Sequence, residues 1–355
     1  MNADMESAPR MQCLGVNYRT APVAVRERFS VPRSRLVQGN ILLHALPGVD
    51  ECVLLSTCNR TEIYYWSSEP EMAYESILNH FLGDVAQADE FSACFYNFCA
   101  EEALEHLAAV ASGLDSMVVG ETEIFGQIKD AYRAAVEGGT TATSANRTFQ
   151  RIFSIAKKVR TQTRITAGPT SLGAVAVQLA HRALGGLEGI NVLVVGAGEI
   201  ARSTAQSLCS RGAESIFVAN RSYDRAVALA EQVGGRVIRF SEWIPYLEKI
   251  DIVIVSTASP VYVVSPAVLR ATQGSREERP LFLIDLSVPR NVDPACAEVP
   301  GVHVYDIDDM EAMVADTRRR RSSEIEHGAV LIREWMLENA PDLLCRQVEP
   351  IRLAD

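Results

Sequence analysis

One cysteine of the chain stands where a nucleophile is expected. Cys58 follows the apolar run ECVLLS, and its polar neighbours are Thr57, Asn59 and Arg60. If that run is a strand, its end presents side chains to a cleft, and the nearby arginine favours the reactive thiolate. The alternative is a core residue, because most cysteines are small buried hydrophobes. The polar surroundings favour the nucleophile.

A glycine-rich loop is the second chemical motif. Residues 196–201 follow the β-branched run NVLVV and open a segment of helical periodicity; they are Gly196, Ala197, Gly198, Glu199, Ile200 and Ala201. A dinucleotide-binding G-x-G-x-x-[GA] loop requires this strand–turn–helix context. The first glycine permits a tight turn, the second lets the backbone approach a pyrophosphate, and the phosphates lie at the helix N-terminus. We expect a dinucleotide here rather than a turn without ligand.

The end of the next strand indicates which dinucleotide binds. An NAD site usually carries Asp or Glu at this point to hold the ribose 2′-hydroxyl. This chain has Asn220, Arg221 and Ser222 instead. An arginine with a hydroxyl suits a 2′-phosphate, so we expect NADPH; the alternative for Arg221 is an ordinary solvated side chain.

A thiolate beside a hydride donor predicts one chemistry above others. Cys58 would attack an activated acyl group to form a thioester, which the hydride then reduces to an aldehyde. Such a site must exclude water, because water would hydrolyse the thioester.

The composition describes a globular protein of more than one domain. The 355 residues are 48% apolar and 22% charged, with a net charge of −11, so two or three domains are expected. That charge does not indicate a nucleic-acid binder, although a local groove can still be basic. No signal peptide or membrane span is recognisable, so we expect a cytoplasmic protein. The eight cysteines include no C-x-x-C pair, and we expect neither a metal site nor disulfides.

We expect an α/β multidomain protein in three parts. Residues 1–165 mix strands and helices and form an α+β catalytic domain that binds the substrate. Residues 166–305 alternate β-branched runs with helical segments, which predicts a Rossmann-type parallel sheet for NADP. Residues 306–355 hold a long linker helix over 306–339 and a short stub. Ala340-Pro341 ends this helix, because proline disfavours the helical conformation of the residue before it.

Five separated blocks resemble those of one enzyme family. They are LGVNYRTAPVAVRERF (14–29), LLSTCNRTEIY (54–64), HLAAVASGLDSMVVGETEIFGQIKDAY (106–132), VGAGEIA (195–201) and IDLSVPRNVDP (284–294). Together they are similar to glutamyl-tRNA reductase over about residues 11–339. That family uses NADPH to reduce glutamyl-tRNA(Glu) to glutamate-1-semialdehyde, the first step of the five-carbon route to 5-aminolevulinate, porphyrins and haem. The resemblance implies this activity, glutamyl-tRNA as substrate, and the semialdehyde aminomutase as a partner.

The resemblance also assigns site residues. Cys58 is then the catalytic nucleophile that displaces the tRNA, and His106 matches a histidine important for activity, although its apolar helix alone indicates a core histidine. Substrate contacts are assigned to Thr57, Asn59, Arg60, Ser116, Glu121, Thr122, Glu123 and Gln127. Arg60 would hold the glutamate carboxylate in a charge-assisted pair. Glu123 departs from the family pattern, in which glutamine is common, and an ionised carboxylate cannot donate a hydrogen bond.

Two other functions remain as alternatives. A shikimate-dehydrogenase-like NADP oxidoreductase would have a similar nucleotide domain, but it needs a lysine–aspartate pair and has no use for Cys58. A non-catalytic paralogue that binds tRNA or has a regulatory role would suit a short C-terminus. Retention of Cys58, His106 and the complete glycine loop in one chain argues against it.

The C-terminal part predicts the assembly. Family members usually follow the long helix with a dimerisation domain, whereas this chain has 16 residues after Asn339. We therefore expect a short form that is a monomer or a weak homodimer. Four arginines at 318–321 interrupt the apolar stripe of the helix; they suit an antiparallel pair or tRNA phosphates, with a solvated face as the alternative.

Overall fold

The chain folds into two compact units. The computed structural model describes residues 9–83, 91–166, 171–213, 215–272, 279–310, 319 and 321–344. The first unit comprises Met1–Ala21, Phe29–Ala167 and Arg320–Asp355, and the second comprises Pro22–Arg28 and Gly168–Arg319. Within the described ranges, no helix combines the length and the apolar character needed to cross a bilayer.

The first unit is built on a four-stranded antiparallel sheet in the order β2-β3-β1-β4. Its strands are β1 (Arg10–Asn17), β2 (Glu51–Ser56), β3 (Arg60–Ser67) and β4 (Tyr96–Cys99). Its helices are η1 (Arg33–Arg35), α2 (Leu36–His44), α3 (Pro70–Leu82), α5 (Glu101–Ser112), α6 (Glu123–Glu137), α7 (Thr143–Gln162) and α13 (Ser322–Leu343). Mixed strands and helices were expected for this part of the chain.

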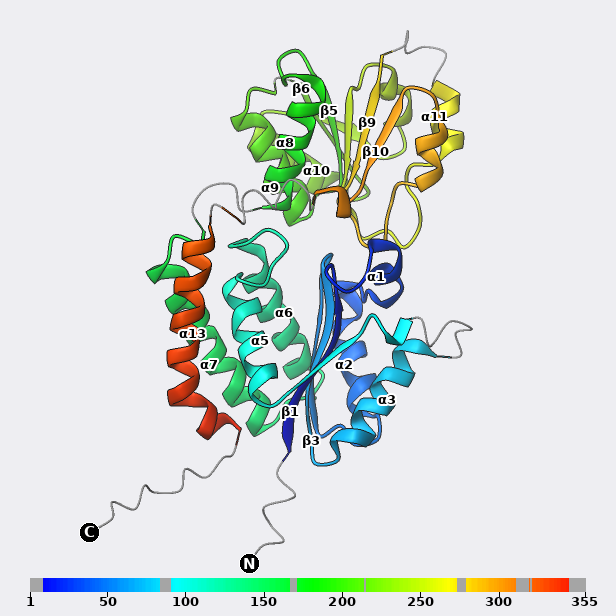
Figure 1. Cartoon of the computed structure of the whole chain (residues 1–355). Helices are drawn as coiled ribbons and strands as arrows, with labels where there is room; N and C mark the ends of the chain where they lie inside the picture. The colour runs from blue at the N-terminus through cyan, green and yellow to red at the C-terminus, as the bar shows by residue number, and fades with distance from the viewer. Residues whose placement is uncertain are drawn as a thin grey trace, which may run out of the picture. The chain divides into compact units, whose positions relative to one another are not determined.

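Helices cover both faces of this sheet, because successive strand residues point to opposite sides. Cys13 and its partner Tyr64 face a core shared with α5, α6, α7 and α13. The neighbouring pair, Leu14 and Ile63, faces a second core shared with α2 and α3. Figure 1 shows these two helix groups on opposite sides of β1 and β3. Even-numbered residues of β3 therefore point toward α5.

The second unit contains a six-stranded parallel sheet in the order β10-β9-β8-β5-β6-β7. The strands are β5 (Asn191–Val195), β6 (Ser215–Asn220), β7 (Arg236–Arg239), β8 (Ile252–Val255), β9 (Leu281–Asp285) and β10 (Val302–Tyr305). The helical segments are α8 (Leu172–Leu184), α9 (Glu199–Ser210), α10 (Tyr223–Val233), η2 (Ile244–Glu248), α11 (Pro266–Thr272), η4 (Pro294–Glu298) and η5 (Asp308–Met310). This order places β5, which carries the glycine loop, inside the sheet, and it confirms the expected Rossmann-type fold.

A short segment from early in the chain belongs to the second unit. Helix α1 (Val23–Phe29) contributes all but its last residue to that unit. Glu27 pairs with Arg290, with 2.9 Å between Glu27 Oε1 and Arg290 Nη2. Asp308 accepts from the backbone N–H of Val23 and from Arg26. Two ionic contacts therefore hold the segment to a part of the chain more than 260 residues later.

The C-terminal helix differs from the one expected over 306–339. Strand β10 and η5 precede it, and α13 begins only at Ser322 and continues to Leu343. Pro341 lies inside its last turn, so the expected end at Ala340-Pro341 is wrong. The core contacts of the buried Ala340 and Leu343 outweigh the local preference of the proline.

The arginines before α13 are not one solvated face. Residues 318 and 320 lie outside the described residues, and Arg319 is exposed. Arg321 is 9% exposed and donates to the carbonyl of Val119. Arg321 therefore has a structural role inside the first unit. Neither the expected antiparallel helix pair nor the alternative of a solvated face predicted this contact.

Candidate functional site

Cys58 lies on the tight turn that joins β2 to β3. The backbone N–H of Thr57 donates to the carbonyl of Arg60 at 2.8 Å and closes the turn. Thr57 Oγ1 accepts from the backbone N–H groups of Asn59 and Arg60, both at 3.2 Å. Cys58 itself is half-buried. The turn therefore holds a partly accessible thiol on a fixed backbone, as a nucleophile requires.

A buried carboxylate organises the residues behind this turn. Glu62 has no exposed surface, and four side chains donate to it. Its Oε1 accepts from Arg60 Nη1 at 2.5 Å, from the Tyr96 hydroxyl at 2.5 Å and from His106 Nε2 at 2.9 Å. Its Oε2 accepts from the Tyr64 hydroxyl at 2.5 Å. We call these five residues the Glu62 network.

The strand geometry explains why these side chains meet. Arg60, Glu62 and Tyr64 are spaced by two on β3 and so share one face. Gly15 on β1 stands directly opposite Glu62. A Cβ atom on Gly15 would lie 2.7 Å from Glu62 Cγ and 3.0 Å from the Tyr96 hydroxyl. The carboxylate therefore fits only because this strand position has no side chain.

The electrostatics of the network favour an ionised Glu62. Burial alone would raise the pKa of Glu62, but the charges of Arg60 and His106 outweigh burial and hold it well below its ordinary value. Burial and the Glu62 charge raise the pKa values of Tyr64 and Tyr96. Both phenols consequently stay protonated and donate. The network fixes the ring of His106 through its Nε2–H bond, and His106 is 11% exposed.

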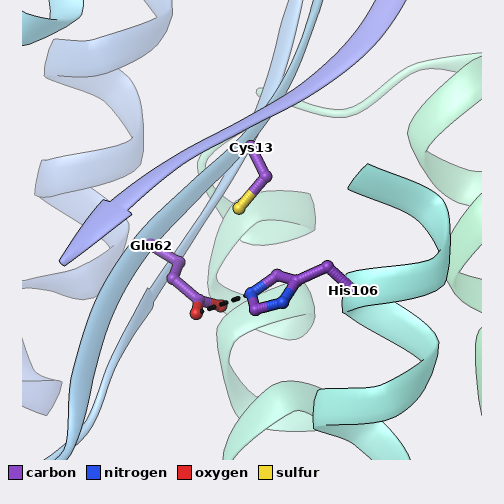
Figure 2. A group of neighbouring side chains, drawn as sticks. All are labelled: Cys13, Glu62 and His106. Carbon is purple, nitrogen blue, oxygen red and sulfur yellow. Dashed lines mark hydrogen bonds and ion pairs between the residues drawn. The ribbon is translucent and has the colours of Figure 1, made fainter. Parts of the chain in front are cut away.

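Cys13 adds a sulfur atom to the same place. Figure 2 shows Cys13, Glu62 and His106 converging from β1, β3 and α5, and their ligand atoms lie within 4.8 Å of one another. This is the one group of three metal-ligating side chains found among the described residues. Burial and the Glu62 charge raise the pKa of the Cys13 thiol well above its ordinary range. Because Glu62 is already saturated by donors, we interpret the group as part of a hydrogen-bonded core, and the absence of a metal stays a prediction.

Arg60 has a second acidic partner in the loop after α5. Its Nη2 donates to the backbone carbonyl of Asp115 and lies 3.3 Å from Asp115 Oδ2. Asp115 Oδ1 also lies 2.7 Å from Arg19 Nη1. Gly113, with a φ of 78°, ends α5 and turns the chain so that Asp115 reaches Arg60. The guanidinium expected to hold substrate is therefore paired within the protein at both ends.

Polar and acidic residues continue beyond this pair. Tyr18 connects the turn to the loop: its N–H donates to the Asn59 carbonyl at 2.9 Å, and its hydroxyl donates to the Ser116 carbonyl at 3.4 Å. Asn59 Oδ1 and Ser116 Oγ are buried, and neither has a hydrogen-bond partner among the residues that the structure describes. Such groups are costly unless a ligand or water completes them.

Glu121 and Glu123 give this region negative charge. Both are 8% exposed. Burial and the charge of Glu123 raise the pKa of Glu121 to about 7, although Ser116 lies near enough to oppose the shift. Among the other expected contacts, Thr122 is exposed and Gln127 is half-buried. The structure thus brings the Cys58 turn, Arg60, His106 and Ser116 together through named contacts, and it places Thr122 and Gln127 at the start of the neighbouring helix α6.

The glycine loop has the geometry that a dinucleotide needs. Gly196 has a φ of 123°, and a Cβ there would lie 1.9 Å from the Ser256 carbonyl, so only glycine fits. A Cβ on Gly198 would meet nothing within 4 Å. Helix α9 starts at Glu199 without a side-chain cap, and Ala201 is fully buried. A pyrophosphate can therefore approach the backbone and the N-terminus of α9.

A pocket of about 310 Å³ lies at the carboxyl ends of β6 and β7. It is lined by Asn220, Arg221, Tyr223, Arg239, Phe240 and Ser241. The Arg239 guanidinium lies 5.1 Å from the centre of the Tyr223 ring. Ser222 is not among the lining residues; its carbonyl accepts from the Asn220 amide at 3.0 Å, and it is the N-cap residue of α10.

Several site residues were missed in the sequence. Glu62, Asp115 and Arg19 carry the ionic structure around Arg60, and Arg239 is a second cation at the pocket. The two-residue spacing of Arg60, Glu62 and Tyr64 was the available signal for the network. For Asp115 and Arg239 no local signal existed, because the fold alone brings them to their partners.

Two family models match separate parts of the chain. The glutamyl-tRNA(Glu) reductase N-terminal domain matches residues 14–163, and shikimate/quinate 5-dehydrogenase matches residues 178–313. The second unit is thus a pyridine-nucleotide domain of the dehydrogenase type. This is the similarity that the shikimate-dehydrogenase alternative anticipated, and it covers only that unit.

Complete relatives match both units together. A glutamyl-tRNA reductase of Akkermansia muciniphila is 51% identical over 333 residues, which cover 94% of this chain and 98% of the relative. One from Deinococcus radiodurans is 38% identical, covering 96% and 95%. The solved glutamyl-tRNA reductase of Methanopyrus kandleri is 34% identical with a TM-score of 0.47, covering 92% of this chain and 79% of that one. The chain therefore belongs to the glutamyl-tRNA reductase family.

Proposed function

We propose that this protein reduces glutamyl-tRNA(Glu) to glutamate-1-semialdehyde with NADPH, through a thioester on Cys58, as the first step of tetrapyrrole biosynthesis. The observation that carries the proposal is the connection of the Cys58 turn, through Arg60, to a buried network that holds His106. In a chain of this family, that connection supports a nucleophile, an oriented imidazole and a cation that act together within the first unit.

The acyl transfer requires only a positioned thiolate. The sulfur of Cys58 attacks the carbonyl carbon of the glutamyl ester, a carbon–sulfur bond forms, and the bond to the ribose oxygen breaks. The departing ribose oxygen takes up a proton, and the glutamyl group remains as a thioester. The turn bonds of Thr57 hold the backbone around the nucleophile in place, and the Glu62 network holds the ring of His106.

Recognition of the glutamyl group uses opposite charges at its two ends. Arg60 is the cation that binds the side-chain carboxylate. Glu121 and Glu123, with the orphaned hydroxyl of Ser116, suit the ammonium group. Glu123 is an acceptor here, which answers the doubt raised by its departure from glutamine. Asn59, with its unpaired Oδ1, is a further acceptor near the nucleophile.

The second unit fits NADPH. Residues 196–201 suit the pyrophosphate, as described, and Arg221 lies at the rim of the pocket together with Arg239. Two cations and no described carboxylate among the lining residues favour a 2′-phosphate over a free 2′-hydroxyl. NADPH, when bound, supplies the hydride whose addition to the acyl carbon breaks the carbon–sulfur bond and releases the aldehyde.

Three further properties complete the proposal. The aldehyde product is reactive, so we place the aminomutase that consumes it as a partner. We also keep a cytoplasmic location and a monomeric or weakly dimeric state, both expected from the sequence. The proposal also includes the residues assigned from the sequence to catalysis, substrate binding and nucleotide binding, with Thr122 and Gln127 as substrate contacts.

The test is a single-turnover assay with glutamyl-tRNA and NADPH that follows semialdehyde formation. Cys58→Ser should form no semialdehyde while keeping its unfolding temperature, because a serine hydroxyl is scarcely ionised at neutral pH. Cys94→Ser, at another half-buried cysteine, is the matched control and should retain activity. Semialdehyde formation by Cys58→Ser would refute the thioester, and inactivity of the wild-type protein would favour the non-catalytic paralogue.

A further inference from the structure

Asp115 occupies an unusual position among the charges of the site. Its carboxylate lies 2.7 Å from Arg19 Nη1, 3.3 Å from Arg60 Nη2 and 3.8 Å from His106 Nδ1. The side chain of Asp115 is 15% exposed, and that of Arg19 is 40% exposed. One carboxylate thus faces two cations and an imidazole at the edge of the buried network.

The two acidic partners of Arg60 differ in how firmly they are held. Glu62 is fully buried, accepts four hydrogen bonds and lies 2.5 Å from Arg60 Nη1. Asp115 lies farther from Arg60, at 3.3 Å, and its other cation, Arg19, is 40% exposed and also donates through Nε to the Tyr18 hydroxyl at 3.0 Å. Moreover, the backbone carbonyl of Asp115 also accepts from Arg60 Nη2, so the loop stays anchored if the carboxylate rotates away.

A substrate carboxylate that binds Arg60 needs a place on its guanidinium. Both terminal nitrogens already have protein partners. Release of Glu62 would leave two tyrosines, His106 and a buried cation without their acceptor, which is costly. Release of the Asp115 carboxylate exposes only an already accessible group. We propose that Asp115 is a displaceable partner of Arg60 that gives way to the side-chain carboxylate of the bound glutamyl group.

The exchange keeps the charge around Arg60 constant. Before it, Arg19 and Arg60 face Glu62 and Asp115, two cations against two carboxylates. When the substrate carboxylate takes the position at Arg60 Nη2, it shares Arg60 with Glu62, and Asp115 keeps its pair with Arg19. A neutral side-chain amide has no charge with which to displace Asp115. Asp115 therefore selects for a carboxylate, a role that rests on the proposed function of Arg60.

The experiment compares Asp115→Asn with the wild type using two unreactive probes. Isoglutamine carries the free side-chain carboxylate with an amide at the α-carbon, and glutaminamide carries amides at both positions. Each is titrated as a protectant of Cys58 against iodoacetamide, with modification read at the Cys58 peptide by mass spectrometry. Asp130→Asn is the matched control, because Asp130 also lies between two arginines, at 2.6 Å from Arg33 and 3.0 Å from Arg133.

The exchange predicts a change for one probe only. Asp115→Asn removes the competing charge, so isoglutamine should protect at about fivefold lower concentration, the factor for a partly exposed ion pair. Protection by glutaminamide should not change, and Asp130→Asn should behave as the wild type. Unchanged or weaker protection by isoglutamine would overturn the exchange and make Asp115 a fixed support of Arg60. The proposed function fails separately, if the wild type forms no semialdehyde from glutamyl-tRNA.

Discussion

Replacement of Glu62 by glutamine tests the central network most directly. Glutamine keeps the shape of the side chain and one carbonyl oxygen, but it loses the negative charge. The hydroxyls of Tyr64 and Tyr96 can rotate to accept from the new amide. Arg60 cannot adapt, because a guanidinium has only donors, and it is 2% exposed.

The expected loss of stability follows from that buried cation. Removing one member of a buried ion pair costs about 3–5 kcal/mol, and Arg60 would keep only its longer contact to the partly exposed Asp115 carboxylate. For a unit of this size, 1 kcal/mol corresponds to a shift of about 2–4 °C in unfolding temperature. Glu62→Gln should therefore lower the unfolding temperature by about 10 °C. It should also reduce turnover below that temperature, because the His106 ring loses its anionic anchor.

Glu51→Gln provides the matched control on the neighbouring strand. Glu51 is 5% exposed, and its oxygens accept from the backbone N–H groups of Ala142, Ser144 and Ala145 at 2.6–3.1 Å. No buried cation depends on it in the described contacts, so its loss should cost about 1 kcal/mol. Both variants are followed by circular dichroism during heating. Equal shifts for the two variants would refute the argument that the Arg60 charge makes Glu62 indispensable.

The loss of stability in Glu62→Gln should depend on pH, and the sign of this dependence follows from the pKa of Glu62. The pKa of Glu62 is lowered on folding, so its contribution to stability is present above the ordinary glutamate pKa and is lost as the pH falls below it. The difference in unfolding temperature between the wild type and Glu62→Gln should therefore narrow on acidification below about pH 4. A constant difference would show that the charge of Glu62 is not what stabilises the fold.

Two further predictions concern the two binding sites. Arg221→Asp should shift the kinetic preference from NADPH toward NADH by about tenfold or more, since a charge-assisted bond contributes about 1.5–3 kcal/mol. Arg239→Ala should shift this preference less. Arg211→Asp, at the exposed end of α9, is the control and should leave the preference unchanged. An unaltered preference in Arg221→Asp would exclude this pocket as the 2′-phosphate site. Because the pKa of Glu121 is raised to about 7, its carboxylate forms as the pH rises through neutrality, and glutamyl-tRNA binding should strengthen from pH 6 to pH 8. Glu121→Gln should flatten that rise, and a rise that persists in the variant would assign it to another group.

The sequence predicted the elements of the second unit better than those of the first. The β-branched run NVLVV corresponds to β5 residue for residue, and the strand expected to end before Arg221 corresponds to β6, because a parallel strand buried on both faces is a continuous apolar run. Strand β10 was missed: its residues were placed in the nucleotide-binding domain, but no strand was predicted there. Residues 302–305 are half exposed, so an edge strand of this kind carries little pattern.

The Glu62 network in the first unit depends on contacts between distant parts of the chain. Local polarity was enough to single out Cys58 and Arg60. The distant contacts of the network were not deducible: Asp115 is 55 residues from Arg60, and His106 reaches Glu62 across 44 residues. Gly15 was also overlooked, since a glycine in a strand signals a close approach only once the opposite residue is known.

The segment 22–28 bears on how this protein can be divided. Its residues lie between two stretches of the first unit, yet Glu27 and Arg26 pair with Arg290 and Asp308 of the second. The backbone therefore passes from one unit to the other four times along its length. A fragment cut at 168 and 319 would retain the glycine loop but leave Arg290 and Asp308 without these ionic partners. Domain exchange among relatives would consequently need a compatible early segment as well as a compatible nucleotide unit, because Glu27 and Arg290 form an ion pair although they lie 263 residues apart in the chain.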